Sequence, residues 1–197
     1  MLKIGILVSG GGSNLQAVLD AIDNGFIKNA EISLVISSNH HAFALERAKS
    51  HGIDAVVLAK KDFESEAKRE EQLLKLLRQY DIGLVALCGS LMVLSEQFIQ
   101  KFERPIINVH PALLPNFGGK GFYGLRVHEA VIASKSPVTG ATVHYVEGGI
   151  DTGKIILQKQ VEVRLDDTPE ILQRRVMEEA EWKILPEVIS MFAEGRL

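Results

Sequence analysis

The chain has 197 residues, 46% of them hydrophobic and 24% charged, and a formal net charge of −3. This composition is typical of one folded globular domain and excludes a disordered chain, and the charge leaves no basic footprint for a nucleic-acid partner. The single cysteine, Cys88, excludes an internal disulfide and a multi-cysteine metal site. The N-terminal apolar run breaks at glycines too early for a signal peptide, so we expect a cytoplasmic protein with no membrane partner.

Short apolar runs rich in β-branched residues alternate with helical patterns along the first half of the chain. The predicted strands cover 3–8, 31–37, 54–58, 82–88 and 105–109. Helical spacing of apolar residues lies between them, at 15–23, 43–51, 65–79 and 95–102. Alternation of this kind predicts a parallel sheet with helices on both faces.

The pattern changes near residue 137. Two further predicted strands, 138–146 and 154–163, follow each other with only a short loop between them, which indicates an antiparallel or mixed edge. We therefore predict an α/β fold with a Rossmann-like, open, mostly parallel twisted sheet of about seven strands, mixed or antiparallel toward its C-terminal edge. No repeat or linker divides the chain, so we expect a single domain over residues 1–197.

A long helix is predicted at the end of the chain. Thr168 is expected to be its N-cap, with Pro169 at the first helical position, where a missing N–H is tolerated. Apolar residues then recur at spacings of three to five, namely Ile171, Leu172, Val176, Ala180, Ile184 and Val188. Pro186 falls inside this pattern, and we expect it to kink the helix.

Two glycine-rich segments have the composition of ligand-binding loops. GGGSN at residues 10–14 joins the first strand to the first helix, where backbone N–H groups and the helix dipole favour an anion. It lacks the lysine of a Walker loop and the third glycine of a dinucleotide loop, so a single phosphate is favoured over a pyrophosphate. A tight turn capped by Ser13 or Asn14 is an equally good interpretation. The second segment, GKGFYG at residues 119–124, has no strand before it, and we interpret it as a flexible flap beside an active site or as a plain surface loop.

Polar residues at the end of the fifth predicted strand have the strongest functional signal. Ligands of open α/β sheets bind beyond the carboxyl ends of the strands. The spacing of Asn108 and His110 puts both side chains on one face, and Pro111 ends the strand. If Asp151, in the turn between the last two strands, lies near His110, its carboxylate would raise the pKa of the imidazole toward neutrality or above. Simple capping of a strand and a turn by these residues is the alternative.

Other polar residues carry weaker signals. His144 lies in a predicted strand, where packing and catalysis are equally compatible with its position. Cys88 ends a buried strand and is expected to be a core thiol. The adjacent His40 and His41 point in different directions, and no histidine pair has metal-binding spacing, so we expect no metal site.

Three motifs together resemble the folate-dependent formyltransferases. They are SGGGSNLQ at 9–16, INVHPALLP at 107–115, and ATVHYV followed by IDTG, at 141–146 and 150–153. The second motif also occurs in members that formylate methionyl-tRNA or hydrolyse formyltetrahydrofolate. Because the length leaves no room for the extra domains of those members, the chain is most similar to members that formylate glycinamide ribonucleotide.

The resemblance implies an enzyme of purine biosynthesis. Its cosubstrate would be 10-formyltetrahydrofolate, the acceptor would be the primary amine of glycinamide ribonucleotide, and no metal would be needed. Hydrolysis of the same folate, or a non-catalytic module that binds a sugar phosphate, are the alternatives. The sequence does not distinguish a monomer from a homodimer.

The resemblance also implies roles for individual residues. The expected catalytic residues are Asn108, His110 and Asp151. The expected substrate-binding residues, for the phosphate and then for the sugar or amine, are Gly12, Ser13, Asn14, Glu178, Glu179, Ala180 and Glu181. The expected folate-binding residues, in addition to Asn108 and Asp151, are Leu91, Met92, Val93, Leu94, Glu147, Gly148, Gly149 and Ile150. The N-terminal part of the domain would hold the phosphate, and the C-terminal part would complete the folate pocket.

Overall fold

A single seven-stranded sheet organises the computed structural model, which describes all of residues 1–197. The strands are β1 (Leu2–Val8), β2 (Ala30–Ser37), β3 (Ala55–Val57), β4 (Leu84–Leu87), β5 (Ile106–His110), β6 (Val138–Tyr145) and β7 (Ile155–Glu162). Their order is β3-β2-β1-β4-β5-β6-β7. The pairs from β3 to β5 are parallel, and β6 and β7 add antiparallel strands at one edge. The predicted mostly parallel sheet with a mixed C-terminal edge is confirmed.

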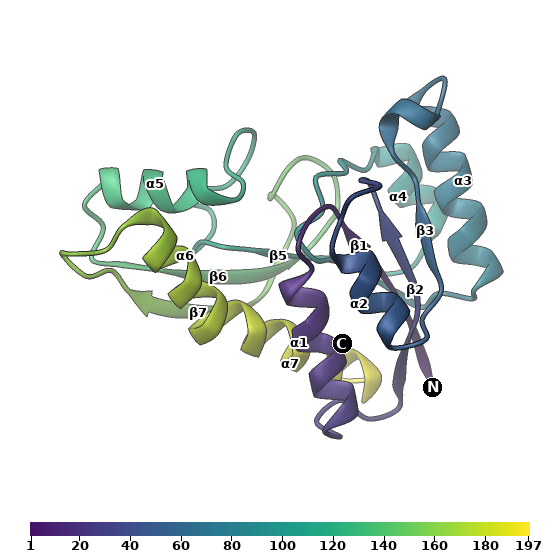
Figure 1. The fold of residues 1–197 in the computed structure, drawn as a ribbon, viewed down its shortest axis with the longest axis horizontal. Coiled ribbons are helices and arrows are strands. Elements are labelled where there is room, and N and C mark those ends of the chain that lie inside the picture. The colour runs from purple at the N-terminus through teal and green to yellow at the C-terminus, as the bar shows by residue number, and fades with distance from the viewer.

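Helices cover both faces of this sheet, as predicted. They are α1 (Ser13–Asp23), α2 (Ala44–Ser50), α3 (Glu66–Gln79), α4 (Glu96–Phe102), α5 (Leu125–Ala133), α6 (Pro169–Val176) and α7 (Trp182–Ala193). One apolar cluster joins the sheet to α1, α2 and α7, and a second joins it to α3 and α4. Figure 1 shows α1 beside α7, and α3 beside α4 at the other end of the sheet.

Side-chain caps begin three of the helices where the sequence has a hydroxyl residue. The hydroxyl of Ser65 accepts a hydrogen bond from the backbone N–H of the third helical residue of α3, and Ser95 does the same for α4. Thr168 caps α6 in this way, with Pro169 at the first position, as predicted. Such caps satisfy N–H groups that have no partner within the helix.

The predicted long final helix is interrupted by one wide turn. The π-helical segment η2 (Met177–Glu181) separates α6 from α7, and α7 continues through Pro186 as far as Ala193. The irregular geometry therefore precedes Pro186, although a kink was expected at the proline. The wide turn leaves Ala180 and Glu181 buried against the sheet.

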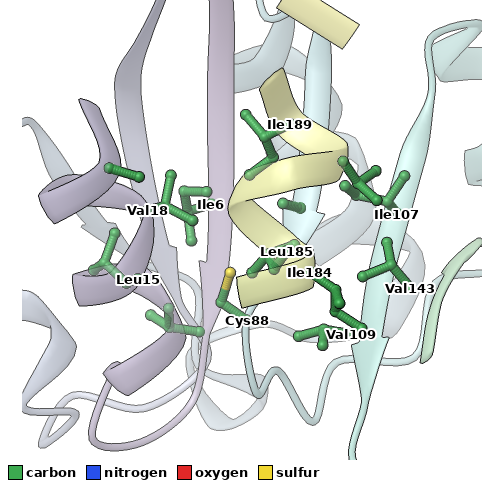
Figure 2. Close-up of a cluster of buried hydrophobic side chains, with 14 of the residues drawn as sticks. Ile6, Leu15, Val18, Cys88, Ile107, Val109, Val143, Ile184, Leu185 and Ile189 are labelled. Atoms are coloured by element: carbon green, nitrogen blue, oxygen red, sulfur yellow. The ribbon is translucent and has the colours of Figure 1, made fainter. Parts of the chain in front are cut away.

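The larger apolar cluster fixes α7 against the centre of the sheet (Figure 2). Ile184, Leu185 and Ile189 of α7 belong to it together with Ile6 of β1 and Ile107 of β5. Cys88 lies in the same cluster, and burial raises the pKa of its thiol, with a smaller contribution from the charge of Glu181. A thiol of this kind is unreactive, which confirms the expected core role of Cys88.

Candidate functional site

The end of β5 brings Asn108 and His110 to one face of the sheet. Antiparallel pairing with β6 places His144 opposite Asn108, and the two side chains meet, with Nδ2 of Asn108 3.1 Å from Nε2 of His144. Nδ1 of His144 lies 2.8 Å from the carbonyl oxygen of Tyr145 and donates to it, since that oxygen can only accept. Nε2 of a neutral His144 is therefore an acceptor for the Asn108 amide.

Asp151 joins these side chains from the turn between β6 and β7. Its Oδ1 accepts a hydrogen bond from Asn108 Nδ2 at 3.3 Å and lies 3.6 Å from His144 Nε2. Its Oδ2 lies 3.4 Å from His110 Nδ1. The backbone of Asp151 has φ 57°, a left-handed conformation that carboxamide and carboxylate residues tolerate better than most. The predicted trio meets around one carboxylate, and His144 lies within the same group.

The segment before the GKGFYG motif closes one side of this cluster. The carbonyl oxygen of Phe117 lies 2.7 Å from His110 Nε2, and the backbone N–H of Gly119 donates to Asp151 Oδ2 at 2.9 Å. A Cβ added at Gly118 would lie 2.4 Å from a Leu114 side-chain atom and 3.3 Å from Asp151 Cβ, so the chain passes close to the carboxylate there. This segment therefore lies beside the catalytic cluster, and a plain surface loop does not describe it.

The charges of this cluster differ from the sequence prediction in one respect. Burial lowers the pKa of His110, and the nearby charge of Asp151 opposes that shift without overcoming it. The predicted net rise in the pKa of His110 is therefore wrong, because the enclosed imidazolium loses hydration. Burial alone would raise the pKa of Asp151, but the hydrogen bond from His144, the charge of His110 and the N–H of Gly119 together lower it. Asp151 is ionised and His110 neutral at pH 7 in the free protein.

The glycine loop turns from β1 into α1 without a side-chain cap. Gly12 is the N-cap residue, with a left-handed backbone (φ 71°), so the alternative in which Ser13 or Asn14 caps the helix is wrong. A Cβ added at Gly12 would lie 2.7 Å from Cβ of Ala44, so α2 packs against the loop too closely for any other residue. Arg47 of α2 donates from Nε to the carbonyl oxygen of Gly11 at 2.9 Å. The loop is thus held from behind, and its first N–H groups remain free of side-chain caps.

Asn14 links the glycine loop to η2. Its Nδ2 donates to Oε2 of Glu181 at 2.6 Å, and both side chains are buried. Burial raises the pKa of Glu181 to about 7, although the hydrogen bond from Asn14 acts in the opposite direction. The Oδ1 atom of Asn14 is buried without a partner. Ser13 also reaches η2, since its hydroxyl lies 3.8 Å from Sδ of Met177.

The other three predicted residues of η2 lie differently. Glu178 is exposed and pairs with Arg174, with Oε1 2.8 Å from Nε. Glu179 is also exposed, whereas Ala180 is fully buried in the core. Of the four residues predicted to approach the substrate, the structure joins only Glu181 directly to the glycine loop.

The segment after β4 alternates between buried and exposed side chains. Met92 and Leu94 are buried in the smaller apolar cluster, whereas Leu91 and Val93 are 63% and 62% exposed. The N–H of Leu91 donates to the hydroxyl of Ser9 at 2.7 Å, which ties the segment to the end of β1. Two anchored side chains therefore hold two apolar side chains out of the surface, as a site for a flat apolar ligand requires.

The turn at residues 147–154 is folded tightly on itself. Oε2 of Glu147 accepts from the N–H of Lys154 at 3.0 Å, and the hydroxyl of Thr152 donates to the carbonyl oxygen of Gly148. Gly148 and Gly149 both have positive φ, at 125° and 73°. Ile150 remains 40% exposed beside Asp151. The turn thus fixes Asp151 and leaves an apolar side chain next to it.

Two further observations bear on other classes of function. The structure contains no group of three or more His, Cys, Asp or Glu side chains that could hold a metal ion. None of its helices combines the length and the apolar character that crossing a bilayer requires.

Sequence reasoning missed several members of the site. Phe117 and Gly119 act through backbone atoms, which no residue type reveals. Ser9 and Met177 contact the predicted segments only because distant parts of the chain meet. The one available signal was His144, whose position in a strand next to Asn108 follows once the antiparallel register is known.

Comparison with known proteins places this geometry in one family. Residues 2–189 match the model described as formyl transferase. The chain is 38% identical over 196 residues to the chloroplastic phosphoribosylglycinamide formyltransferase of Arabidopsis thaliana, covering 99% of this chain but only 66% of the relative, just under two thirds. It is 36% identical over 197 residues to phosphoribosylglycinamide formyltransferase of Haemophilus influenzae, covering 100% of this chain and 90% of the relative. Glycinamide ribonucleotide transformylase 1 from Symbiobacterium toebii has a TM-score of 0.92 and 40% identity, with 100% and 90% of the two chains covered.

Proposed function

The chain belongs to the formyl transferase family, and from that premise we propose that it transfers the formyl group of 10-formyltetrahydrofolate to the primary amine of glycinamide ribonucleotide. The products are formylglycinamide ribonucleotide and tetrahydrofolate, as in purine biosynthesis. The observation that carries the proposal is the meeting of Asn108, His110 and Asp151 around one carboxylate, with no nucleophilic side chain among them. The relatives named for the same reaction support it.

The absence of a nucleophile suits a reaction in which the substrate supplies one. The amine attacks the formyl carbon, and the formyl oxygen gains negative charge. Asn108 donates an N–H to that oxygen, a contribution that is typically worth about 10²- to 10³-fold in rate. Holding the two reactants in one geometry supplies much of the remaining acceleration.

The pair of ionised Asp151 and neutral His110 accounts for the proton. After attack, the nitrogen carries a proton that it must lose, and the pair accepts it directly or through water. The resulting imidazolium lies beside the oxyanion and stabilises it. The same proton is then delivered to N10 of the leaving tetrahydrofolate, so the pair ends as it began. Proton transfer of this kind contributes roughly 10²- to 10⁴-fold.

Ligand positions follow from the two halves of the domain. Gly12, Ser13 and Asn14 hold the phosphate of the ribonucleotide, with Glu181 of η2 facing its sugar. Residues 91–94 contact the pteridine, mainly through backbone groups, and residues 147–151 complete the folate pocket. We also place the reaction in the cytoplasm. A monomer and a homodimer are both compatible with this arrangement.

A spectrophotometric assay of tetrahydrofolate release tests the proposal. The protein is mixed with 10-formyltetrahydrofolate, with and without glycinamide ribonucleotide, and formate is measured in parallel. Release that requires the ribonucleotide, without formate, is the expected result. Formate production without the amine would show a hydrolase instead, and no release under either condition would show a binding module.

A further inference from the structure

A cavity of about 340 Å³ lies outside the site described above, where β2 and β3 end. Its polar lining comes from Ser38, Asn39, His40, His41, Lys60 and Lys61. The two lysines belong to the 3-10 helix η1 (Lys60–Asp62), and the two histidines to the loop after β2. The cavity therefore lies at the same carboxyl edge of the sheet as the catalytic cluster, the edge at which ligands of open α/β sheets bind.

The balance of charge in this cavity leaves room for an anion. Nζ of Lys60 lies 3.2 Å from Glu66, and Nε2 of His40 lies 2.6 Å from Oδ2 of Asp62. The side chains of Lys61 and His41 have no acidic partner. Glu66 is also shared with Arg69. Four basic groups thus face two carboxylates, one of which is shared further, so additional carboxylates would find unpaired cations.

Hydrogen bonds connect the floor of the cavity to the segment proposed to hold the pteridine. The hydroxyls of Ser38 and Ser9 are 2.6 Å apart, and Asn39 donates from Nδ2 to the carbonyl oxygen of Ser9 at 3.3 Å. The same Ser9 hydroxyl accepts from the N–H of Leu91. The cavity and residues 91–94 are therefore neighbours, with a single residue between them.

The arrangement of the sheet gives the distance and the direction. β2 and β4 are separated only by β1, so their ends lie about 10 Å apart at the usual spacing of strands. Leu58, just before η1, belongs to the apolar cluster of Met92 and Leu94, whereas the glycine loop leads into α1 in the other cluster. A chain leaving residues 91–94 along this rim reaches the lysines without crossing the proposed phosphate position.

We propose that this cavity binds the carboxylates of the γ-linked glutamate tail of the folate cosubstrate. The inference rests on the proposed function and deepens it, because the tail is the one polyanionic part of that ligand and extends away from the formyl-bearing nitrogen. Lys61 and Lys60 would pair with successive carboxylates, and His41 would add a donor. A solvent-exposed ion pair changes a binding constant by up to about fivefold, so the two lysines together account for roughly 3- to 20-fold.

Turnover with two forms of the donor tests this assignment. KM is measured for 10-formyltetrahydrofolate bearing one glutamate and bearing five, in the wild type and in the double variant Lys60→Gln/Lys61→Gln. We expect the wild type to have a KM about 3- to 20-fold lower for the longer donor, and the double variant to have nearly equal values for the two. The matched control, Lys68→Gln/Lys75→Gln, removes two exposed charges from α3 and should keep the wild-type ratio.

Three results would overturn the assignment. They are equal KM values in the wild type, a preference that persists in the Lys60/Lys61 variant, and a rise in the KM of the ribonucleotide in that variant, which would assign the cavity to a phosphate. Calorimetric binding of folate pentaglutamate separates this inference from the proposed function. Tail-dependent binding that is lost in the double variant supports the cavity even if no formyl transfer occurs, whereas transfer without tail-dependent binding supports the function alone.

Discussion

Nδ1 of His110 lies 3.4 Å from Oδ2 of Asp151, while Nε2 of the same ring lies 2.7 Å from the carbonyl oxygen of Phe117. Both ring nitrogens therefore face oxygens that only accept hydrogen bonds. A second proton on the ring would complete both contacts, yet burial lowers the pKa of His110 and keeps the free ring neutral. A negative charge arising beside the ring would shift this balance toward the imidazolium, as the proposed reaction requires.

Replacing Asp151 by Asn tests the proton-accepting pair. The amide keeps the shape of the carboxylate and can still accept from Gly119, but it removes the charge that opposes the desolvation of His110. We expect kcat to fall by about 10²- to 10⁴-fold, with a smaller change in the KM of either substrate. Steady-state kinetics on Asp151→Asn and on the exposed control Asp166→Asn measure this. A near-wild-type kcat in Asp151→Asn would remove Asp151 from the mechanism.

Gly12 should be the most sensitive position of the glycine loop. In Gly12→Ala, the new methyl group would meet Ala44 in a backbone conformation with positive φ, and we expect a loss of about 2 to 4 kcal/mol of unfolding free energy with a higher KM for the ribonucleotide. Urea denaturation and kinetics measure the two effects. Gly10→Ala is the control, since its added Cβ would touch nothing within 4 Å. Equal behaviour of the two variants would contradict the packing described here.

Glu181 should make the protein less stable as the pH rises. Its pKa is raised to about 7 in the folded state from the model value of 4.5, so the folded state binds more protons than the unfolded state between these values. Stability from this group is present below the unfolded pKa and is lost as pH rises to the folded pKa. We expect Glu181→Gln to gain up to about 3 kcal/mol relative to the wild type at pH 8 compared with pH 4.5. Urea denaturation of both proteins at the two values measures it, and a pH-independent difference would refute the shift.

His128 should have the opposite dependence on pH. It is fully buried in α5 with neither ring nitrogen bonded, and burial lowers its pKa to about 4 from 6.5, with the charge of His110 adding to the shift. The unfolded state then binds more protons between these values, so stability falls as the pH drops from 6.5 to 4.

The variant His128→Leu isolates this contribution. It removes the titrating ring and keeps an apolar side chain, so its unfolding free energy should fall less on acidification, by about 3 kcal/mol over that range. The difference between the two proteins cancels the contributions of Glu181 and of other groups. Parallel pH curves for the wild type and the variant would show that His128 does not titrate in this range.

The sheet could be predicted from sequence because its signals are local. Strand–helix alternation and the change of pattern near residue 137 give the parallel sheet and its antiparallel edge, and Thr168-Pro169 marks the start of α6. The start of α1 was less predictable, because Gly12 turns the chain through a left-handed conformation that removes the need for a hydroxyl cap. The position of η2 was also not predictable, since a π turn depends on how the helix packs rather than on its apolar spacing.

Proximity in the candidate site could be predicted only in part. Asn108 and His110 share a face through their spacing, but the position of Asp151 depends on the register of β6 and on a left-handed turn. The direction of the pKa shift at His110 was missed because burial, which no residue pattern gives, outweighs the nearby carboxylate. Residue types therefore predicted the members of the cluster, while its charges depended on the three-dimensional structure.

The rate of formyl transfer by His110→Ala tests the central claim most directly. The rate is measured in a single turnover with both substrates saturating, after circular dichroism has shown the variant to be folded, and His51→Ala on the surface is the control. We expect the His110 variant to lose about 10²-fold or more in rate while its binding of folate and ribonucleotide changes little, and the control to match the wild type. A folded His110→Ala protein that transfers the formyl group at the wild-type rate would contradict the account.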